Sequence, residues 1–319
     1  MSGLLEIVTF SVALIGLVAW LGTVFLAPSR LSSGMPPGPR ALLARLWLYA
    51  PFWIPALVLV ASLLPGTLGA LLGFGDHCTL HGGHHHHLCL WHPPHLSNHP
   101  LAWSISAAVL LPVVCLLARA AWARWQERRL AAALVRTSRP SSLGPDIRLL
   151  DRQEPIALTV GVLHPVILLS TGLLASVSPQ TLAIIVRHER AHVRRRDTTR
   201  ALLDGFAAAI LPRALRADLL RELTLAREQA CDRAAAQKEG RVQVAAALTE
   251  VARLGLPQPA FGMSAGASSL EARVLHLLNP PSLSRWWPAW PMTCVVVLAA
   301  LGAGPIHNLI ERVVTLLLH

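Results

Sequence analysis

Charged residues are scarce in this chain. Only 14% of the 319 residues are Asp, Glu, Lys or Arg, whereas 53% are hydrophobic and the mean hydropathy is +0.50. Charged residues make up about a quarter of an average soluble domain. The composition therefore argues against an ordinary soluble protein and predicts a chain that is partly surrounded by lipid.

Basic residues are missing ahead of the first hydrophobic run. Residues 7–27 form an uncharged run of 21 residues, and only Glu6 carries a charge before it. A run of this length can cross a hydrocarbon core of about 30 Å. A cleaved signal peptide would have basic residues before its apolar part. We therefore expect an uncleaved membrane span.

Three further apolar runs predict membrane spans, at about residues 46–74, 101–122 and 286–306. Pro51, Pro55 and Pro65 are expected to break or tilt the second span. The predicted organisation is a membrane region at 1–124, a soluble domain at 125–285, and a fourth span with a short tail at 286–319. Residues 28–45 are expected to form a linker between the first two spans.

Lys and Arg are absent from residues 75–100. In contrast, residues 28–45 contain Arg30, Arg40 and Arg45, and residues 123–285 hold 23 of the 28 basic residues against 14 of the 17 acidic ones. The positive-inside rule places both basic segments in the cytoplasm and both termini outside a bacterial inner membrane. Membrane lipid is the expected partner of this charge. Few aromatics interleave with the arginines, so direct nucleic-acid binding is not expected.

The motif that organises the chain is HERAH at residues 188–192, which follows an apolar stretch without Gly or Pro. On a helix, His188 and His192 share a face and can bind one metal ion. Glu189 could take a proton from a metal-bound water, whose pKa zinc lowers from about 16 towards roughly 7. This is the arrangement of a zinc peptidase. The alternative is a pair of surface histidines on a charged helix.

A zinc site with one open position needs three protein ligands. Glu228, in the downstream segment EQACD, is the best third candidate, and Asp232 lies on the same helical face. Asp232 could accept the free ring N–H of a ligand histidine and fix its tautomer. Asp197 is expected to end the HERAH helix and to support the ligands together with Asp232. An exposed acidic pair on an amphipathic helix is the alternative for Glu228 and Asp232.

The runs HERAHVRRRD and EQACD, with GVLHPVILLSTGLLASVSPQTLAIIV upstream, resemble the membrane metallopeptidases of the BlaR/MecR antirepressor type, peptidase family M56. The resemblance covers residues 145–235 well and the four-span layout more loosely. It implies that His188, His192 and Glu228 bind Zn²⁺ and that Glu189 is catalytic. It also implies that the substrate is a cytoplasmic BlaI/MecI-like winged-helix repressor. Arg190 departs from the family's pattern, in which an apolar residue is usual.

We therefore expect a mainly α membrane protein, with four transmembrane helices and a cytoplasmic α+β zincin-like (gluzincin) domain between the third and fourth. Residues 120–137 should continue the third span as a helix, and strands are predicted at 147–150, 156–160 and 166–170. The last strand is expected to be an exposed edge that receives an extended peptide. Ser178 and Pro212 should begin the two ligand helices. Residues 258–269 are expected to form a flexible link.

Residues 75–100 hold nine of the fifteen histidines. Neutral imidazoles and thiolates bind zinc, copper or nickel, so this loop could sense metal outside the membrane. The candidate ligands are His77, Cys78, His81, His84, His85, His86, His87, Cys89 and His92. The alternatives are a polar connector that binds metal adventitiously and a Cys78–Cys89 disulfide. Cys115, Cys231 and Cys294 are expected to be buried.

Two other functions remain open at this stage. The HERAH motif also resembles HtpX-like membrane peptidases of quality control, and a non-catalytic metal receptor would bind metal without needing Glu189. Only 13 residues follow the fourth predicted span, so we do not expect a penicillin-binding sensor domain. The cleavage site, the activating signal and the oligomeric state do not follow from the sequence.

Overall fold

The computed structural model describes residues 2–27, 37–72, 100–254, 266–280 and 312. The fourth predicted span, the histidine-rich loop and Cys294 lie outside these residues. The chain divides into two compact units. One consists of residues 1–27, 46–116 and 284–319, and the other of residues 28–45 and 117–283.

Three long helices contain the apolar runs: α1 (Ser2–Leu26), α2 (Pro37–Leu72) and α4 (Pro100–Thr137). Within them, Val8–Leu26, Gly38–Ala61 and Pro100–Thr137 have the length and hydropathy needed to cross a membrane. The first three predicted spans fall on these helices. The described part of the chain therefore has the helices of a membrane protein.

Helix α2 differs from the prediction in two ways. It begins at Pro37 and not at residue 46, so the second half of the predicted linker is helical. Prolines are well tolerated in the first turn of a helix, where the missing N–H has no partner to lose. The helix also continues through Pro51, Pro55 and Pro65 without a break. The expected break in the second span is therefore wrong, as membrane helices often accommodate proline, and the expected tilt stays a prediction.

Helix α4 runs from the apolar residues into the basic segment without interruption, as predicted for residues 120–137. Trp122 and Trp125 contact each other with ring centroids 4.8 Å apart, and the Arg129 guanidinium lies 4.4 Å from the Trp125 ring centre. This group lies where the apolar composition of α4 gives way to charge. The expectation that Cys115 is buried is wrong, since it is exposed on α4.

The sheet has four strands in the order β1 (Arg139–Ser141), β2 (Gly144–Leu150), β4 (Val166–Ser170) and β3 (Ala157–Val160). Strands β2 and β4 are parallel, and the other two pairs are antiparallel. The three predicted strands are confirmed, and β1 was missed because Arg-Pro-Ser has no apolar pattern.

The expectation that residues 166–170 form an exposed edge is wrong. Strand β4 pairs with β2 on one side and with β3 on the other. Ile167, Leu168 and Leu169 are all completely buried. A continuous apolar run of this kind is typical of a strand covered on both faces. The edges of the sheet are β1 and β3.

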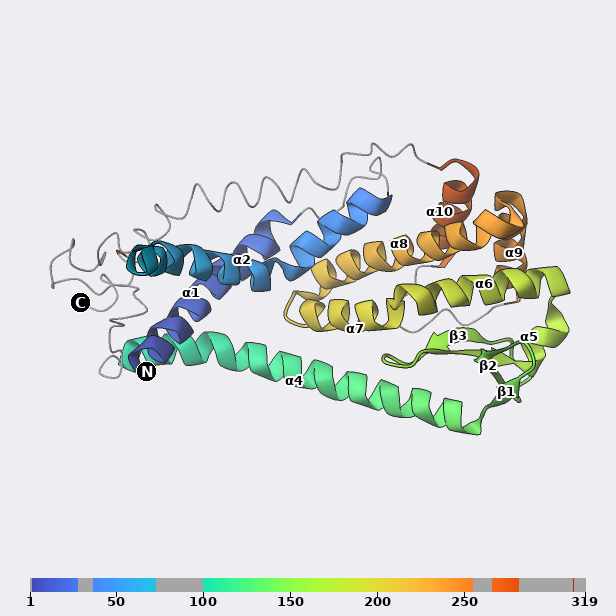
Figure 1. The fold of residues 1–319 in the computed structure, drawn as a ribbon, viewed down its shortest axis with the longest axis horizontal. Coiled ribbons are helices and arrows are strands. Elements are labelled where there is room, and N and C mark those ends of the chain that lie inside the picture. Colours follow the sequence, from blue (N-terminus) through green and yellow to red (C-terminus); the bar gives the residue numbers. More distant parts are fainter. Residues whose placement is uncertain (1, 28–36, 73–99, 255–265, 281–311, 313–319) are drawn as a thin grey trace. The chain divides into compact units, whose positions relative to one another are not determined.

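Helices α5 (Thr171–Ser176) and α6 (Pro179–Arg195) follow the sheet. Ser178 caps α6 as predicted, because its hydroxyl accepts the Thr181 N–H at 3.1 Å. Helix α6 lies between the sheet and α8 (Arg213–Glu239) (Figure 1). Ile185 and Val186 of α6 pack with Ile167 of β4 in the core. The other face of α6 is therefore available to α8.

Helix α6 ends at Arg195. Arg196 has a φ of 52°, and its N–H closes the helix by donating to the His192 and Val193 carbonyls. Asp197 therefore opens the next helix, α7 (Asp197–Ala208), and does not end α6 as expected. The prediction that Pro212 precedes the helix carrying Glu228 is confirmed.

The last described helices are α9 (Arg241–Arg253) and α10 (Gly266–Leu278), which pack against α8 and against each other. The expectation of a flexible link at residues 258–269 is wrong for residues 266–269, because they form the first turn of α10. Ile184 of α6 packs with Val244 of α9 and Leu277 of α10 in a second core. Helix α10 is thereby fixed beside the ligand helices.

Candidate active site

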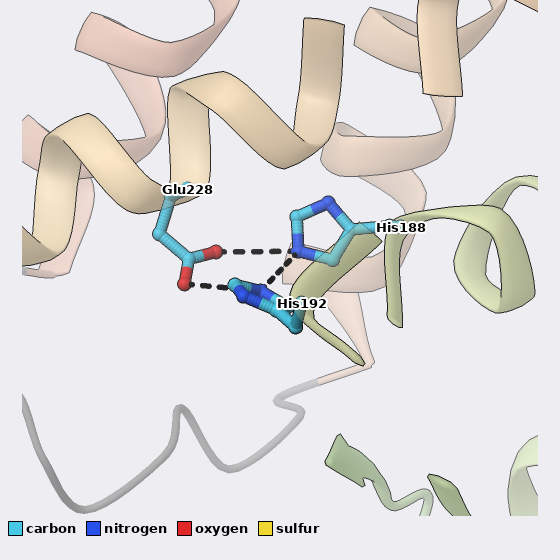
Figure 2. Close-up of side chains that lie close together, drawn as sticks. All are labelled: His188, His192 and Glu228. Atoms are coloured by element: carbon cyan, nitrogen blue, oxygen red, sulfur yellow. Dashed lines mark hydrogen bonds and ion pairs between the residues drawn. The ribbon is translucent and has the colours of Figure 1, made fainter. Parts of the chain in front are cut away.

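The three predicted metal ligands meet between two neighbouring helices. His188 and His192 come from α6 and Glu228 comes from α8 (Figure 2). The two Nε2 atoms of the histidines are 3.1 Å apart. Glu228 Oε2 lies 3.4 Å from His188 Nε2, and Oε1 lies 3.6 Å from His192 Nε2. The four atoms therefore converge on one point.

These separations suit a zinc ion. Tetrahedral zinc with bonds of about 2.0–2.1 Å keeps its ligand atoms about 3.3 Å apart. The observed distances lie on both sides of that value, and two imidazoles with one carboxylate form a common catalytic zinc donor set. Three protein ligands also leave the fourth position open. The residues present therefore fit a zinc ion of the catalytic type.

The Nδ1 atom of each histidine contacts a buried aspartate. His188 Nδ1 lies 2.9 Å from Asp232 Oδ1, and His192 Nδ1 lies 3.0 Å from Asp197 Oδ2. In a neutral imidazole, a carboxylate at Nδ1 keeps the proton on that nitrogen and leaves Nε2 free to bind metal. Asp232 and Asp197 therefore make the contacts with the histidines that were expected from the sequence.

The electrostatics of the site favour a bound cation. Burial lowers the pKa of His188, but hydrogen bonds to Asp232 and Glu228 outweigh it and raise this pKa to about 10. Burial alone would raise the pKa of Glu228, but His188 and Arg273 hold it well below its usual value. Without a metal, a proton on His188 compensates the carboxylates. Zinc would replace that proton.

Arg273 of α10 was not predicted from the sequence. It donates from Nε and Nη2 to the two Asp232 oxygens at 2.8 and 2.7 Å, and its Nη1 lies 3.1 Å from Glu228 Oε2. Despite burial, these carboxylates raise the pKa of Arg273. Arg273 thus fixes the predicted ligand Glu228, and it also fixes Asp232, which orients His188. No motif surrounds Arg273, so the sequence offers no signal for it.

Glu189 lies between the two ligand histidines on α6 and is buried. Thr159 of the edge strand β3 donates its hydroxyl to Glu189 Oε2 at 2.7 Å. The sheet therefore holds the candidate general base in place through a single hydroxyl. Thr159 was not predicted either, because its position in Ala-Leu-Thr-Val looks like that of any β-branched strand residue.

Cys231 is buried, as expected, but it also contacts the site. Its Sγ lies 3.3 Å from His192 Nδ1 and 3.5 Å from Asp197 Oδ2. Burial and the nearby carboxylates raise the pKa of the thiol. In the absence of a metal, Cys231 therefore extends the hydrogen-bonded group of His192 and Asp197 behind the predicted ligands. The ligand atoms of His192, Asp197 and Cys231 also lie within 4.8 Å of one another.

Arg190, the departure from the pattern of the BlaR/MecR family, contacts the sheet. Its Nε and Nη2 donate to Asp146 of β2 at 2.8 and 2.9 Å. Gly144, with a φ of 155°, precedes Asp146, and a Cβ there would come within 2.5 Å of Arg190 Nη2. The ion pair therefore joins α6 to strand β2 of the sheet.

The nine candidate ligands in the predicted external loop lie outside the described residues. Among the described residues, the His188–His192–Glu228 group is the one in which two histidine Nε2 atoms and a carboxylate converge.

Comparison with known proteins supports a metallopeptidase. Residues 119–254 match the model of peptidase family M48. No curated protein and no solved structure matches the chain. The matched stretch begins in α4 and ends after α9, so it contains the sheet and both ligand helices. The match supports a metallopeptidase and does not confirm the BlaR/MecR type. Over residues 119–254, which include His188, Glu189, His192 and Glu228, this chain is similar to the metallopeptidases of family M48.

Proposed function

We propose that this chain is an integral-membrane zinc endopeptidase whose active site consists of His188, His192, Glu228 and Glu189. One observation carries the proposal. Two imidazole Nε2 atoms and a carboxylate converge at zinc-like separations, and a buried aspartate supports each imidazole. The family M48 match over the same residues supports it. A helix surface with scattered histidines would not need this second layer of carboxylates.

Zinc bound at this site would supply Lewis-acid chemistry and lower the pKa of water to about 7. Glu189 then serves as the general base. Its carboxylate accepts a proton from the attacking water and returns it to the leaving amine. The Thr159 hydroxyl occupies Oε2, so it fixes the carboxylate and leaves Oε1 to exchange the proton. Asp232 and Asp197 keep the ligand histidines oriented throughout.

Strand β3 is the better candidate for binding the substrate backbone, in place of residues 166–170. One side of β3 pairs with β4, and its other side has no strand partner among the described residues. An extended peptide can add to such an edge through main-chain hydrogen bonds. Thr159 on this strand contacts Glu189, so a peptide bound along β3 would pass the general base.

The proposed location is a bacterial inner membrane, with the peptidase region in the cytoplasm. The support is the arginine content of residues 28–45 and 123–285 and the lack of Lys and Arg in residues 75–100. There the enzyme would cleave a BlaI/MecI-like repressor, as the BlaR/MecR resemblance implies. An HtpX-like role in membrane quality control agrees equally well with the M48 match. Metal binding by residues 75–100 is proposed as the external signal.

The test uses full-length protein in membranes, with matched Glu189→Gln and His188→Ala variants. Wild-type protein should bind about one zinc per chain at the central site and cleave a protein substrate. Glu189→Gln should keep this zinc and lose cleavage, whereas His188→Ala should lose both. Zinc is counted in a separate set of the same variants that lacks residues 75–100, so that the histidine-rich loop does not contribute. Normal cleavage by Glu189→Gln would refute the mechanism.

The same preparations distinguish the candidate functions. A peptidase that signals should cut a small winged-helix repressor at one position and leave unfolded membrane proteins intact. A quality-control enzyme should degrade unfolded membrane proteins at many positions. A metal receptor without catalysis would bind zinc and cleave neither substrate, with or without Glu189.

A further inference from the structure

A cavity of about 560 Å³ lies in the unit that carries the metal ligands. Its walls come from the first turns of α2, the end of α6, α8, the start of α9, and α10. The arginines that line it are Arg45, Arg195, Arg227, Arg233 and Arg241, and His276 lines it as well. Among the described residues, no aspartate or glutamate lines the cavity. Its volume is in the range of small-molecule sites, about 300–1,000 Å³.

Several of these charges lack a counter-charge. Arg195 pairs with Asp197 at 3.2 Å, and the buried Arg227 pairs with Asp204 at 3.1 Å. Arg45, Arg233 and Arg241 take part in none of the ion pairs found between described residues. The cavity therefore gathers more positive charge than the described side chains around it balance.

The charges around the cavity also act on one another. The pKa of Arg227 is lowered by burial, and the charge of Arg45 lowers it further against the opposing effect of Asp204. The pKa of His276 is lowered by burial and by Arg233. Like charges that face a shared space repel each other, so an anion in that space would be stabilised by all of them.

One residue that lines the cavity has an unpaired hydrogen-bond acceptor. Gln229 lines it and is 4% exposed, and its Nε2 donates to the Ala272 carbonyl at 3.2 Å. Its Oε1 is buried without a hydrogen-bond partner among the described residues. Buried polar atoms are rarely left unpaired. A ligand that combines an anionic group with a hydroxyl donor would satisfy both the arginines and this amide.

We propose that this cavity binds a phosphate group, supplied by the glycerol-containing headgroup of an anionic phospholipid. Guanidinium groups match phosphate oxygens with paired hydrogen bonds. The place of the cavity identifies the source. One of its walls, at Gly38, Ala41, Leu42 and Arg45, belongs to the first turns of the span candidate Gly38–Ala61. Lipid phosphates lie at the depth where such a helix enters the bilayer, and basic groups there select anionic lipids.

The test is a binding measurement on full-length protein in a neutral detergent, titrated with short-chain phosphatidylglycerol. Phosphatidylcholine of the same chain length serves as the neutral-headgroup comparison, and glycerol phosphate as the soluble source of the same phosphate. We expect phosphatidylglycerol to bind at least ten times more tightly than either. Equal affinity for the two lipids would overturn the proposal. Equal affinity for glycerol phosphate would identify a soluble ligand and overturn the lipid source.

Variants locate the binding. Arg233→Gln with Arg241→Gln removes two of the unpaired charges and should weaken phosphatidylglycerol binding about tenfold, or about 1.4 kcal/mol. Arg139→Gln with Arg253→Gln is the matched control, since these exposed arginines do not line the cavity and the net charge changes equally. An equal loss in both pairs would mean general charge attraction and would overturn the proposal. Unchanged zinc content reports that each variant is folded, and proteolysis is not needed for either measurement.

Discussion

Arg273 and Asp232 form a bidentate ion pair next to His188 of the candidate metal site. The two hydrogen bonds are 2.8 and 2.7 Å long, and Asp232 is completely buried. A buried carboxylate needs such a partner, because leaving it unpaired is strongly unfavourable. The pair lets Asp232 remain charged while it orients His188. The orientation of the His188 ring therefore depends on α10, which carries Arg273 but contributes no metal ligand.

Replacing Arg273 should weaken zinc binding although this residue does not touch the metal. We expect Arg273→Ala to reduce zinc affinity about 10- to 100-fold, because Asp232 and Glu228 lose their common partner. Arg273→Lys should recover part of the affinity, since it restores charge but not the paired geometry. Competition with a fluorescent zinc chelator measures the effect. Arg253→Ala is the control, and a zinc affinity for Arg273→Ala equal to that of the control would contradict the assignment.

Removing the Thr159 hydroxyl should slow catalysis without loss of metal. In Thr159→Val, Glu189 loses the 2.7 Å hydrogen bond that fixes its carboxylate. A lost hydrogen bond of about 1–1.5 kcal/mol corresponds to a roughly tenfold lower kcat. Thr159→Ser keeps the hydroxyl and should retain most activity. Rates and zinc content should be measured together, because a fall in zinc content would point to a structural role instead.

Zinc binding should depend on pH through His188. Its pKa is about 10 without metal, so His188 is protonated at pH 7 and must lose this proton to bind zinc. Apparent zinc affinity should therefore rise up to about tenfold per pH unit as the pH increases towards 10. Titration calorimetry at pH 7 in buffers of different ionisation enthalpy should show release of about one proton. The release should be smaller in Asp232→Asn. No proton release by wild-type protein would rule out this linkage.

The ion pair between Arg190 and Asp146 should stabilise the fold at neutral pH. The hydrogen bond from Arg190 lowers the pKa of Asp146 below its usual value of 3.8. The stabilisation is therefore present above about pH 3.8 and is lost as the pH falls through the lower folded value. Asp146→Asn should reduce the free energy of unfolding by about 1 kcal/mol at pH 7. Urea unfolding at pH 7 and pH 3 measures this, with the exposed Arg194→Gln as control. An equal effect of Asp146→Asn at both pH values would contradict it.

The topology can be checked with a reporter that is active only outside the cytoplasm. Fusions at residues 88 and 319 should be active and a fusion at residue 150 inactive, because Arg is concentrated in residues 28–45 and 123–285. Activity at residue 150 would place the metal ligands outside. It would then exclude a cytoplasmic repressor as the substrate.

The elements around the metal ligands follow from local sequence signals. Ser178 with Pro179 marks the start of α6, and the apolar run at residues 166–170 marks a strand. His188 and His192 lie on one face of α6 because helical periodicity brings residues i and i+4 together, whereas Glu228 reaches them from α8. Local sequence signals do not show which distant segments pack against each other. The strand order that buries β4 and exposes β3 depends on such pairing, and so does the approach of Thr159 to Glu189.

The role of Arg273 also could not be predicted from the sequence. It follows Asp232 by 41 positions and lies in a segment without a recognisable pattern. Its role arises from the packing of α10 on α8 and α9, which no single stretch of sequence encodes. In contrast, the start of α2 was missed for a local reason. The predicted span was defined by hydropathy, and the helix continues into the mixed residues before it.

The order of these residues along the chain also has a consequence for biosynthesis. All three candidate ligands are made before Arg273, which lies on the last described helix of this unit. Because domains are synthesised from the N-terminus, a nascent chain can expose its ligands to zinc before the Arg273 side chain exists. Such a chain would hold metal loosely and with poorly oriented imidazoles. We expect the peptidase to mature only when α10 has docked, which keeps an unfinished copy from cutting proteins during its own insertion into the membrane.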